Sequence, residues 1–264
     1  MSPDPTPNYI VTNGSLWIFP VPNTTLTKDY RHINTDGIYW QTYGYFEIEA
    51  RLPHGKGPWP AFWLLNHDQS VARPEIDIME AYPGGGPNSG WSDANLNPTA
   101  YAATVYVGDA VNARTQVGHQ VLQTTDLSAD YHKYALKWDP NQQTFYFDGV
   151  QFFTLNVTIP DRMFILLSYQ FGSASGQPDS TTPLGLSNAF AIRYIRAWQV
   201  LDQPLVPSVA SPAATPPTSD TSPLSPATPP SVTTSATPTP IHPPVTSGAS
   251  LLPWAAFVIT WIAL

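Results

Sequence analysis

The sequence of 264 residues contains no cysteine, so disulfide bonds cannot contribute to its stability. This absence does not exclude a secreted protein, because a domain of about 200 residues can bury enough core to fold without disulfides. Charged residues are also scarce: 11 Lys and Arg stand against 19 Asp and Glu, which gives a formal net charge of -8. An acidic balance of this kind argues against nucleic acid as a partner. No glutamate follows Glu80, so the acids near that residue stand out.

Composition divides the chain into three parts. Residues 1–203 have an ordinary globular composition and are expected to form one domain. Residues 204–246 are rich in Pro, Ser and Thr, and 13 of the chain's 30 prolines lie between positions 204 and 244, which predicts a disordered linker. Residues 247–264 end in the apolar run LLPWAAFVITWIAL, which is shorter than the about 20 residues that a transmembrane helix needs.

The two ends of the sequence predict a surface location. Small residues followed by an apolar C-terminal run are typical of a glycosylphosphatidylinositol (GPI) anchor signal, and a short tail anchor or an apolar end without function are the alternatives. The first residues, MSPDPTPNYIV, lack the basic and apolar regions of a signal peptide, so the sequence is expected to lack its true start. Sequons at Asn13, Asn23 and Asn156 favour a secreted or cell-surface glycoprotein that meets the membrane only through its lipid.

Residues 9 to about 200 have the pattern of short β-strands. The segment YGYFEIEARL, Tyr43 to Leu52, alternates between two sets of residues with a period of two. Further runs rich in aromatic and β-branched residues are FWLL, ATVYVG, YALKWD, TFYFDGVQFF and AIRYIRAWQV. Turn-forming pairs such as Asn13-Gly14 and Asp148-Gly149 separate such runs. Because no long segment has a helical period, we predict an all-β sandwich or barrel of antiparallel sheets.

Three carboxylates, Glu75, Asp77 and Glu80, interrupt the apolar segment RPEIDIMEAY. In a regular strand, Glu75 and Asp77 share one face and Glu80 points to the other. One extra residue, a β-bulge, would return Glu80 to the first face, and the flexible Met79 is expected to be that residue. The two glutamates would then lie about 13 Å apart at Cα, which leaves about 5 Å between their carboxyl groups.

A separation of about 5 Å is typical of retaining glycosidases, in which one carboxylate is the nucleophile and the other is the general acid and base. Asp77 lies between the two glutamates and can influence their orientation and protonation. Two other interpretations stay open. The first is a solvated strand face, which the repulsion between like charges disfavours, and the second is a calcium site, for which three oxygens on one strand are too few.

The segment EIDIME resembles the Glu-x-Asp-x-x-Glu signature of glycoside hydrolase family 16 in its bulged, laminarinase-like form. The segments YGYFEIEARLPHGKGPWPAFWLL, DYHKYALKWDPNQQTFYFDGV and IRYIRAWQV also resemble family segments, in the same order along the chain. The resemblance covers about residues 8–200. It implies a concanavalin A-like jelly-roll sandwich of two antiparallel sheets, with a sugar-binding cleft on the concave face.

By this resemblance, Glu75 corresponds to the nucleophile, Glu80 to the acid and base, and Asp77 to a helper carboxylate. Further residues are expected to bind the substrate, some because they match family positions and some because they lie near the carboxylates: Trp59, Trp63, Arg73, Tyr106, His132 and Gln170. Tryptophan faces stack on sugar rings. Trp63 could instead belong to the core, and His132 could be purely structural.

The sequence departs from the family pattern at two places near the expected cleft. The segment AATVYVG has Val105 and Tyr106 where a histidine often lies near the reaction centre, and LLSYQFGS brings Ser168 and Gln170 to a strand whose usual sequence differs. The reaction type is therefore better defined than the sugar that the cleft accepts, and a galactan stays open beside the glucans.

The resemblance implies a secreted, retaining endo-β-glucanase that hydrolyses β-1,3 or mixed β-1,3/1,4 glucan by double displacement. Two alternatives use the same scaffold: a wall-remodelling transglycosylase with the same carboxylates, and a carbohydrate-binding module without catalysis. The reaction needs no cofactor and no catalytic metal, although the family allows a structural calcium on the convex side. The expected partner is the polysaccharide, and the protein is expected to be a monomer.

Overall fold

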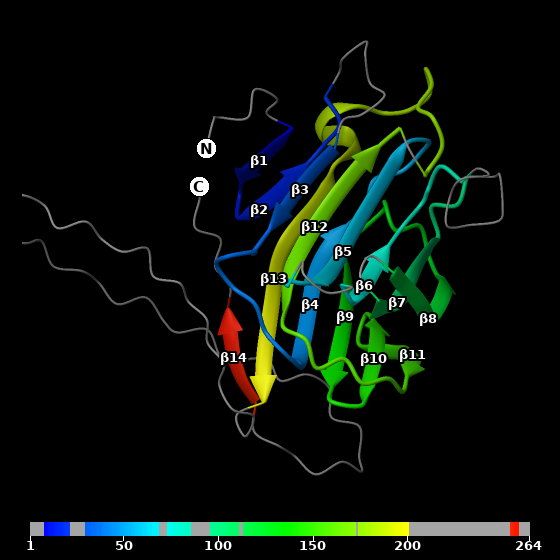
Figure 1. The fold of residues 1–264 in the computed structure, drawn as a ribbon. Coiled ribbons are helices and arrows are strands. Elements are labelled where there is room, and N and C mark those ends of the chain that lie inside the picture. Colours follow the sequence, from blue (N-terminus) through cyan, green and yellow to red (C-terminus); the bar gives the residue numbers. More distant parts are fainter. Residues whose placement is uncertain are drawn as a thin grey trace, which may run out of the picture.

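The computed structural model describes residues 8–21, 30–68, 73–85, 96–110, 113–172, 174–200 and 254–258. Within these ranges nearly all regular structure is β-strand, and the helical element is one short 3-10 turn, η1 (Gly185–Asn188). No helix in this part of the chain has the length and apolar character needed to cross a bilayer. The all-β prediction is confirmed (Figure 1).

The first sheet has eight antiparallel strands in the order β1-β2-β13-β4-β9-β10-β11, with β14 paired to β13. Its strands are β1 (Tyr9–Thr12), β2 (Ser15–Ile18), β4 (Gly44–Arg51), β9 (His132–Asp139), β10 (Gln142–Phe147), β11 (Val150–Leu155), β13 (Phe190–Val200) and β14 (Trp254–Val258).

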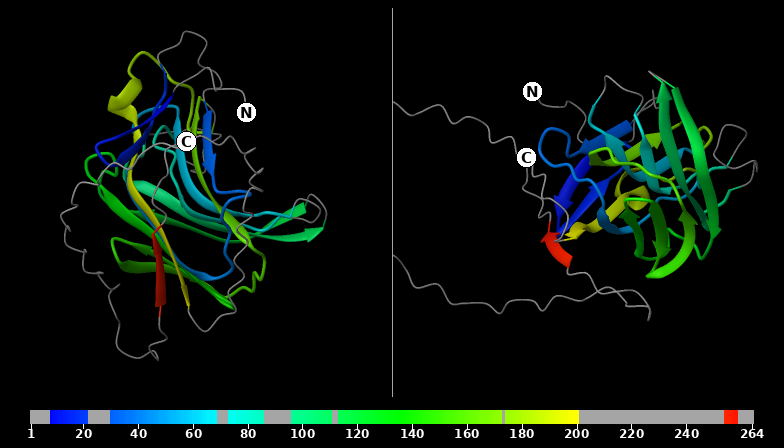
Figure 2. Two further views of the ribbon diagram at one scale, coloured as in Figure 1. Left: turned by 90° about the vertical axis from the view of Figure 1, so that its left-hand side faces the viewer. Right: turned by 60° about the horizontal axis from the view of Figure 1, so that its bottom comes forward.

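The second sheet has six antiparallel strands in the order β3-β12-β5-β6-β7-β8. Its strands are β3 (Tyr30–Asn34), β5 (Pro58–Asn66), β6 (Glu75–Glu80), β7 (Ala100–Ala110), β8 (Ala113–Gln123) and β12 (Met163–Phe171). The acidic segment EIDIME forms β6, which lies inside the sheet between β5 and β7. Strands β7 and β8 form a long hairpin at one edge of this sheet (Figure 2).

The core lies between the two sheets, because alternate residues of each strand turn inward. Phe46 and Ile48 of β4 and Phe62 and Leu64 of β5 are completely buried in one cluster that both sheets share. The residues between them in β5, such as Trp63, turn to the opposite face of the second sheet. We call this opposite face the site face, because it also carries the acids of β6.

Two of the predicted turns have the backbone that their sequences favour. Asn13 and Gly14 between β1 and β2 have φ angles of 50° and 71°, and Asp148 and Gly149 between β10 and β11 have 48° and 80°. Positive φ at both central residues is the geometry of a tight two-residue hairpin, and Asn-Gly and Asp-Gly adopt it most readily. The predicted strands and hairpins of this region are confirmed.

The linker predicted for residues 204–246 lies outside the described residues. Of the apolar tail, only β14 is described, and it pairs with residues 196–200 of β13. The domain boundary at residue 203 and the anchor signal in residues 247–264 therefore stay predictions.

Candidate active site

Strand β6 contains a β-bulge. Against β5, Phe62 is paired with Met79 and Trp63 with Asp77, so Ile78 has no partner in the ladder. The bulge that the spacing of the acids predicts is confirmed: the ladder with β5 leaves Ile78 unpaired, whereas Met79 was expected, and the ladder with β7 leaves both unpaired. Both side chains are buried, so either can fill the core at this point. The backbone pairing between the strands, rather than the flexibility of a side chain, decides which residue is unpaired.

The bulge separates the apolar side chains of β6 from its acids. Four side chains in and just after the strand belong to the core: Ile76, Ile78, Met79 and Ala81. Glu75, Asp77 and Glu80 lie on the site face and interact with one another, since the charges of Glu80 and Glu75 both raise the pKa of Asp77 and that of Glu75 raises the pKa of Glu80. The acids of this trio therefore share one face, as a retaining pair requires.

Asp77 is the most enclosed member of the trio, with 5% of its surface exposed. Burial is the largest cause that raises its pKa well above the usual value, and the charges of Glu80 and Glu75 add to it. Its cross-strand neighbours are Trp63 on β5 and Thr104 on β7. The protonated form of Asp77 is thus favoured in the folded protein, and a protonated carboxyl group can donate a hydrogen bond to a neighbouring carboxylate.

Glu80 is surrounded by uncharged donors. The indole Nε1 of Trp59 donates a hydrogen bond of 2.9 Å to Glu80 Oε1, and the Tyr82 hydroxyl also bonds to this carboxylate. Burial raises the pKa of Glu80, and the bonds from Tyr82 and Trp59 oppose that rise only in part. The rings of Trp59 and Tyr82 lie against each other with centroids 5.4 Å apart. The site therefore raises the pKa of Glu80 while fixing its position.

Glu75 has cationic neighbours instead. Arg114 of β8 forms an ion pair with Glu75 Oε2, and its guanidinium lies 5.6 Å from the ring centroid of Tyr106. Burial raises the pKa of Glu75, while Arg114 and, more weakly, Arg73 lower it. A carboxylate beside a guanidinium keeps its charge more easily than one held by neutral donors. Burial therefore raises the pKa of both glutamates, but cations oppose the rise at Glu75 and neutral donors oppose it at Glu80, a difference that suits a nucleophile and a general acid.

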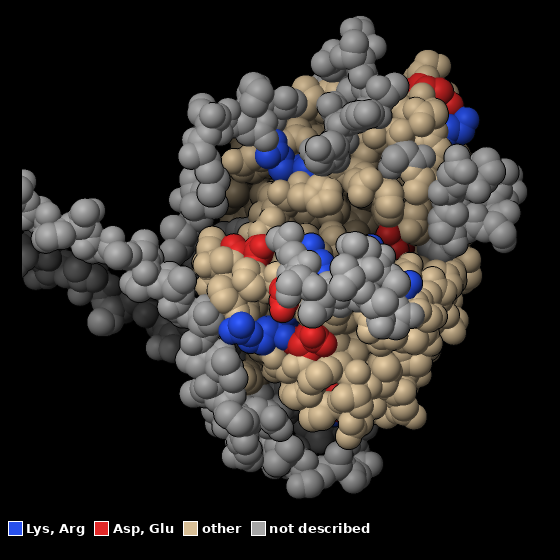
Figure 3. Space-filling model, viewed as in Figure 1, with Lys and Arg blue, Asp and Glu red and all other residues tan. Residues whose placement is uncertain are grey.

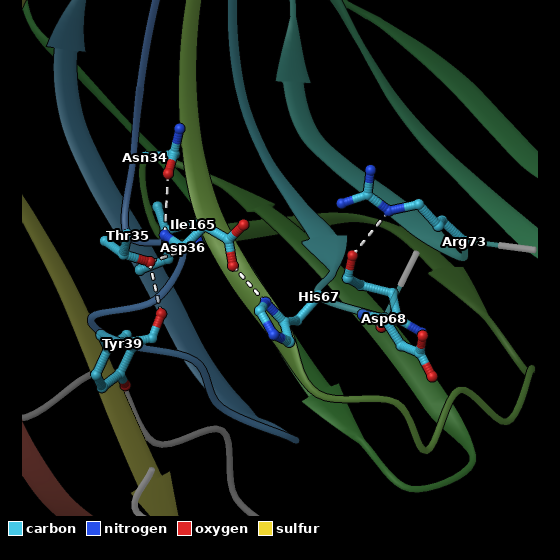
Figure 4. Close-up of polar contacts among 9 residues, drawn as sticks. Asn34, Thr35, Asp36, Tyr39, His67, Asp68, Arg73 and Ile165 are labelled. Carbon is cyan, nitrogen blue, oxygen red and sulfur yellow. Dashed lines mark hydrogen bonds and ion pairs between the residues drawn. The ribbon is translucent and has the colours of Figure 1, made fainter. Parts of the chain in front are cut away.

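Arg73 lies just before β6, near the Glu75 end of the trio. Its Nε donates a 3.0 Å hydrogen bond to the backbone carbonyl of Asn66 at the end of β5, as the close-up in Figure 4 shows. In the same view, His67 makes an ion pair with Asp36. The His67 ring stacks on Trp40, with centroids 4.9 Å apart and planes 6° apart. The bond to Asn66 thus anchors Arg73 to the backbone. The charge of Arg73 lowers the pKa of Glu75 without a direct bond between the two side chains.

Three further predicted residues lie on the site face. Trp63 lies outside the core between the sheets, is half-buried against a smaller apolar cluster on this face, and donates a 2.8 Å hydrogen bond from Nε1 to Ser168 Oγ on β12. Gln170 of β12 is the cross-strand partner of Trp59, and Tyr106 of β7 is that of Glu75. Each of these side chains has the position that a sugar-contacting residue needs, and contact with a sugar stays a prediction.

His132 does not join this group. It begins β9 in the first sheet, where its Nδ1 lies 2.7 Å from Asp148 Oδ2 and its ring stacks on Phe147 with centroids 5.0 Å apart. The expectation that His132 binds substrate is corrected here, because its ring is held by the β10–β11 turn on the other sheet. The structural interpretation of this residue fits its contacts.

Several residues of the site were not found from the sequence. Tyr82 follows the acidic strand, Thr104 is the partner of Asp77, and Arg114 and His119 come from β8. Thr104 Oγ1 lies 3.0 Å from His119 Nδ1. Asp77, Thr104 and His119 thus form a row of polar side chains that crosses from β6 to the edge strand β8. A signal existed for Tyr82, which is an aromatic donor two residues beyond Glu80. No sequence pattern indicated Arg114 or His119, which approach the acids only because β8 pairs with β7 and β7 pairs with β6.

The described residues contain no group of three or more His, Asp or Glu side chains with the geometry of a metal site. The trio itself is a row along one strand with no ligand from a loop, which does not fit calcium coordination. A structural calcium elsewhere stays a prediction of the resemblance.

Comparison with protein families decides which group the fold and site belong to. Residues 25–164, just over half of the chain, match the family model described as "Glycosyl hydrolases family 16". The chain belongs to glycosyl hydrolases family 16. This membership and the two antiparallel sheets confirm the predicted jelly-roll sandwich.

Relatives in family 16 include enzymes with several substrates. The structure of "the catalytic domain of an endo-1,3-beta-glucanase (laminarinase)" from Thermotoga petrophila RKU-1 is 28% identical with a TM-score of 0.57, and the match covers 74% of this chain and 81% of that one. The "Endo-1,3-1,4-beta-glycanase EglC" of Rhizobium meliloti is 29% identical over 202 residues, which are 73% of this chain and 40% of the relative. The "Keratan-sulfate endo-1,4-beta-galactosidase" of Sphingobacterium multivorum is 26% identical over 213 residues, 74% of this chain and 47% of the relative. The chain spans less than half the length of these two curated relatives.

Proposed function

We propose that the chain is a retaining endo-β-glucanase that cleaves internal β-1,3 or mixed β-1,3/1,4 bonds of a polysaccharide. The observation that carries this proposal is the bulge in β6, which brings Glu75, Asp77 and Glu80 to one face. Membership of family 16 and the glucanases among its relatives support it. Most of the described surface visible in Figure 3 is uncharged, which suits a neutral polysaccharide.

The first step forms a covalent intermediate. Glu80 gives its proton to the glycosidic oxygen as the bond from that oxygen to the anomeric carbon breaks, while Glu75 attacks the anomeric carbon and becomes a glycosyl ester. The part of the chain with the new hydroxyl group leaves. Burial raises the pKa of both glutamates; Glu80 suits the role of acid because its partners are neutral, and Glu75 suits the role of nucleophile because Arg114 favours its charged form.

The second step reverses these roles. Once Glu75 is an ester it has no charge, so the repulsion that raised the pKa of Glu80 is removed and Glu80 remains a carboxylate. Glu80 then takes a proton from water as the oxygen attacks the anomeric carbon, and Glu75 leaves as a carboxylate. Two inversions at one carbon retain its configuration.

The direct test uses variants of the two glutamates with a panel of defined glucans and galactans. Wild-type protein is expected to release new reducing ends from laminarin or mixed-linkage glucan, with the β-anomer as the first product by NMR. Glu75→Ala with azide and an activated β-glucoside should form the α-glycosyl azide, whereas Glu80→Ala should form the β-glycosyl azide. Substantial hydrolysis by Glu75→Gln would refute the assignment of the nucleophile.

The same panel separates the alternatives. Binding to insoluble glucan without any new reducing ends would identify a carbohydrate-binding module, and elongation of a labelled acceptor oligosaccharide would identify a transglycosylase. Cleavage of the galactans alone would move the substrate away from glucan while leaving the roles of the carboxylates intact.

We also propose that the mature protein is a secreted or surface-attached glycoprotein that acts on cell-wall polysaccharide as a monomer. The sequons at Asn13 and Asn156 are exposed, and the composition of residues 204–264 supports a linker followed by a lipid-anchor signal. Release from intact cells by a phosphatidylinositol-specific phospholipase tests the anchor. Retention of the protein on cells after that treatment would exclude it.

A further inference from the structure

We infer that Arg114 is a positioning residue of this site: it binds one carboxylate oxygen of Glu75 and leaves the other oxygen free to attack the anomeric carbon. This inference rests on the proposed function, since it concerns the nucleophile of that reaction. It assigns a role to a residue of β8, which is the edge strand of the second sheet and lies two strands away from β6.

The geometry of the intervening strand β7 brings the guanidinium to the acid. On β7, Gly108 is the cross-strand partner of Arg114, and Tyr106 is the partner of Glu75. Gly108 presents no side chain, and the Tyr106 ring lies under the guanidinium at 5.6 Å from its centroid. The arginine therefore crosses β7 over an aromatic ring and ends at Glu75 Oε2.

A purely stabilising role does not account for this pair. Arg114 has 45% of its side chain exposed, and ion pairs with an exposed partner contribute little to folding stability. Glu75, in contrast, has only 14% of its side chain exposed, so the nearby positive charge acts strongly on its protonation. The main effect of the pair is thus on the chemical state of the acid.

The other groups around Glu75 make this cation important. Burial disfavours its negative charge and is the largest cause that raises its pKa, and Arg114 is the main group that opposes this rise. The charged and titratable groups that face it are Asp77 and Glu80 on β6, Arg73 before β6, Tyr106 on β7 and Arg114 on β8, and its neighbour on β5 is the apolar Leu65. Arg73 is bonded to a backbone carbonyl, which leaves Arg114 as the direct partner of the nucleophile.

The pair affects both steps of the reaction. In the first step, the arginine keeps Glu75 charged and fixes Oε2, so that Oε1 forms the new bond to carbon while Glu80 protonates the leaving oxygen. In the second step, the negative charge returns to the Glu75 carboxylate as the ester bond breaks, and the guanidinium stabilises that charge. Loss of Arg114 should therefore lower kcat and kcat/KM together rather than raise KM alone.

The test compares Arg114→Gln and Arg114→Lys in the full chain with Arg193→Gln as a matched control. Arg193 makes an ion pair with Glu49 on the first sheet, with 50% and 20% of the two side chains exposed, which closely resembles the exposure of the Arg114–Glu75 pair. The readouts are kcat/KM against pH and the rate at which an activated 2-deoxy-2-fluoro glycoside labels Glu75, followed by mass spectrometry.

For Arg114→Gln we expect kcat/KM to fall by about 10- to 100-fold and the acid limb of its pH profile to move up by about one pH unit. The sign follows from charge: without the cation, Glu75 holds its proton to a higher pH. Labelling of Glu75 should slow by a similar factor, Arg114→Lys should recover part of the loss, and Arg193→Gln should resemble wild type.

A folded Arg114→Gln protein with the wild-type acid limb and labelling rate would overturn the inference, as would a variant in which only KM changes. These outcomes differ from failure of the proposed function, in which the wild-type protein itself releases no sugar and is not labelled at Glu75. Circular dichroism and thermal melting of each variant confirm that the compared proteins are folded.

Discussion

Trp59 on β5 and Glu80 on β6 are joined by a 2.9 Å hydrogen bond from the indole Nε1 to the carboxylate Oε1. The sequence resemblance suggests a sugar-stacking role for this tryptophan, yet its polar edge is directed at the proposed acid. One side chain can do both, because the donor lies in the plane of the ring and stacking uses the ring face. The position of the acid is thereby coupled to the residue expected to hold the sugar.

Trp59→Phe tests this coupling, because it keeps an aromatic ring and removes the donor. The lost hydrogen bond had stabilised the Glu80 carboxylate, so the pKa of Glu80 should rise. We expect the basic limb of the kcat/KM profile, where Glu80 loses its proton, to move up by about 0.5 to 1 pH unit. We also expect kcat to fall by about tenfold, since the acid is less well positioned.

Trp63→Phe is the matched control for this prediction. It removes an indole donor from the same strand and face, but that donor bonds to Ser168 rather than to an acid. Its substrate affinity should change while the basic limb stays in place. Equal shifts in both variants would show that the tryptophan ring, rather than the bond to Glu80, sets the pH profile.

Much of the fold could be predicted from local sequence. The alternation of YGYFEIEARL matches β4, and the pairs Asn13-Gly14 and Asp148-Gly149 form tight turns because few other residues adopt positive φ at both positions. The bulge in β6 was predictable because the acids are spaced by two and then three residues, which regular alternation cannot place on one face. Which residue is unpaired was less predictable, since Ile78 and Met79 are both buried: β5 pairs with Met79 and leaves out Ile78, and β7 leaves out both.

The contacts across the sheet could not be predicted in this way. Strand β8 has the sequence ARTQVGHQVLQ, which lacks aromatic residues, and it was not recognised as a strand. Arg114 reaches Glu75 only because the registers of β6 with β7 and of β7 with β8 combine. Register depends on pairing between distant segments, so nothing near Glu75 in the chain indicates its partner. For His132 the error was of another kind. Its segment resembles a family segment, but that resemblance did not reveal that its ring contacts Asp148 and Phe147.

Asp77→Asn should stabilise the protein in a pH-dependent way. Burial and the charges of Glu80 and Glu75 raise the pKa of Asp77 in the folded state well above its unfolded value. The folded state therefore holds this proton more tightly, so the contribution of Asp77 to stability is fully present below about pH 4 and is lost as the pH rises through the folded pKa. Asparagine cannot ionise, so its advantage in melting temperature over wild type should grow as the pH rises above about 4, while kcat falls.

Asp179→Asn provides a control of opposite sign. Hydrogen bonds from Lys56 and Thr181 lower the pKa of this exposed aspartate, so its contribution to stability is present above the unfolded pKa and is lost in acid. The melting temperature of Asp179→Asn should therefore lie below that of wild type at neutral pH, and the two values should converge as the pH falls. A melting temperature for Asp77→Asn that runs parallel to wild type at every pH would contradict the protonation assigned to Asp77.

The length of the bulged strand can be tested by changing it by one residue in each direction. Deletion of Ile78 leaves Glu-Ile-Asp-Met-Glu, in which regular alternation keeps all three acids on one face and the glutamates four steps apart. Insertion of one alanine after Ile78 also keeps the acids on one face, but it moves the glutamates to six steps, about 6.6 Å farther apart than before. The two variants thus keep the fold and the common face of the acids, and they differ in the distance between Glu75 and Glu80.

We expect the deletion variant to retain measurable hydrolysis of the glucan that wild type cleaves, reduced by about 10- to 100-fold because a shift of about 1 Å already has this effect. The insertion variant should lose more than about 10³-fold, since its carboxyl groups can no longer reach one anomeric carbon and its leaving oxygen together. Ile78→Ala controls for lost packing, because Ile78 is almost completely buried and its truncation costs about 2 to 5 kcal/mol at unchanged chain length. If the deletion variant folds and is as inactive as the insertion variant, the spacing of Glu75 and Glu80 is not what the bulge provides.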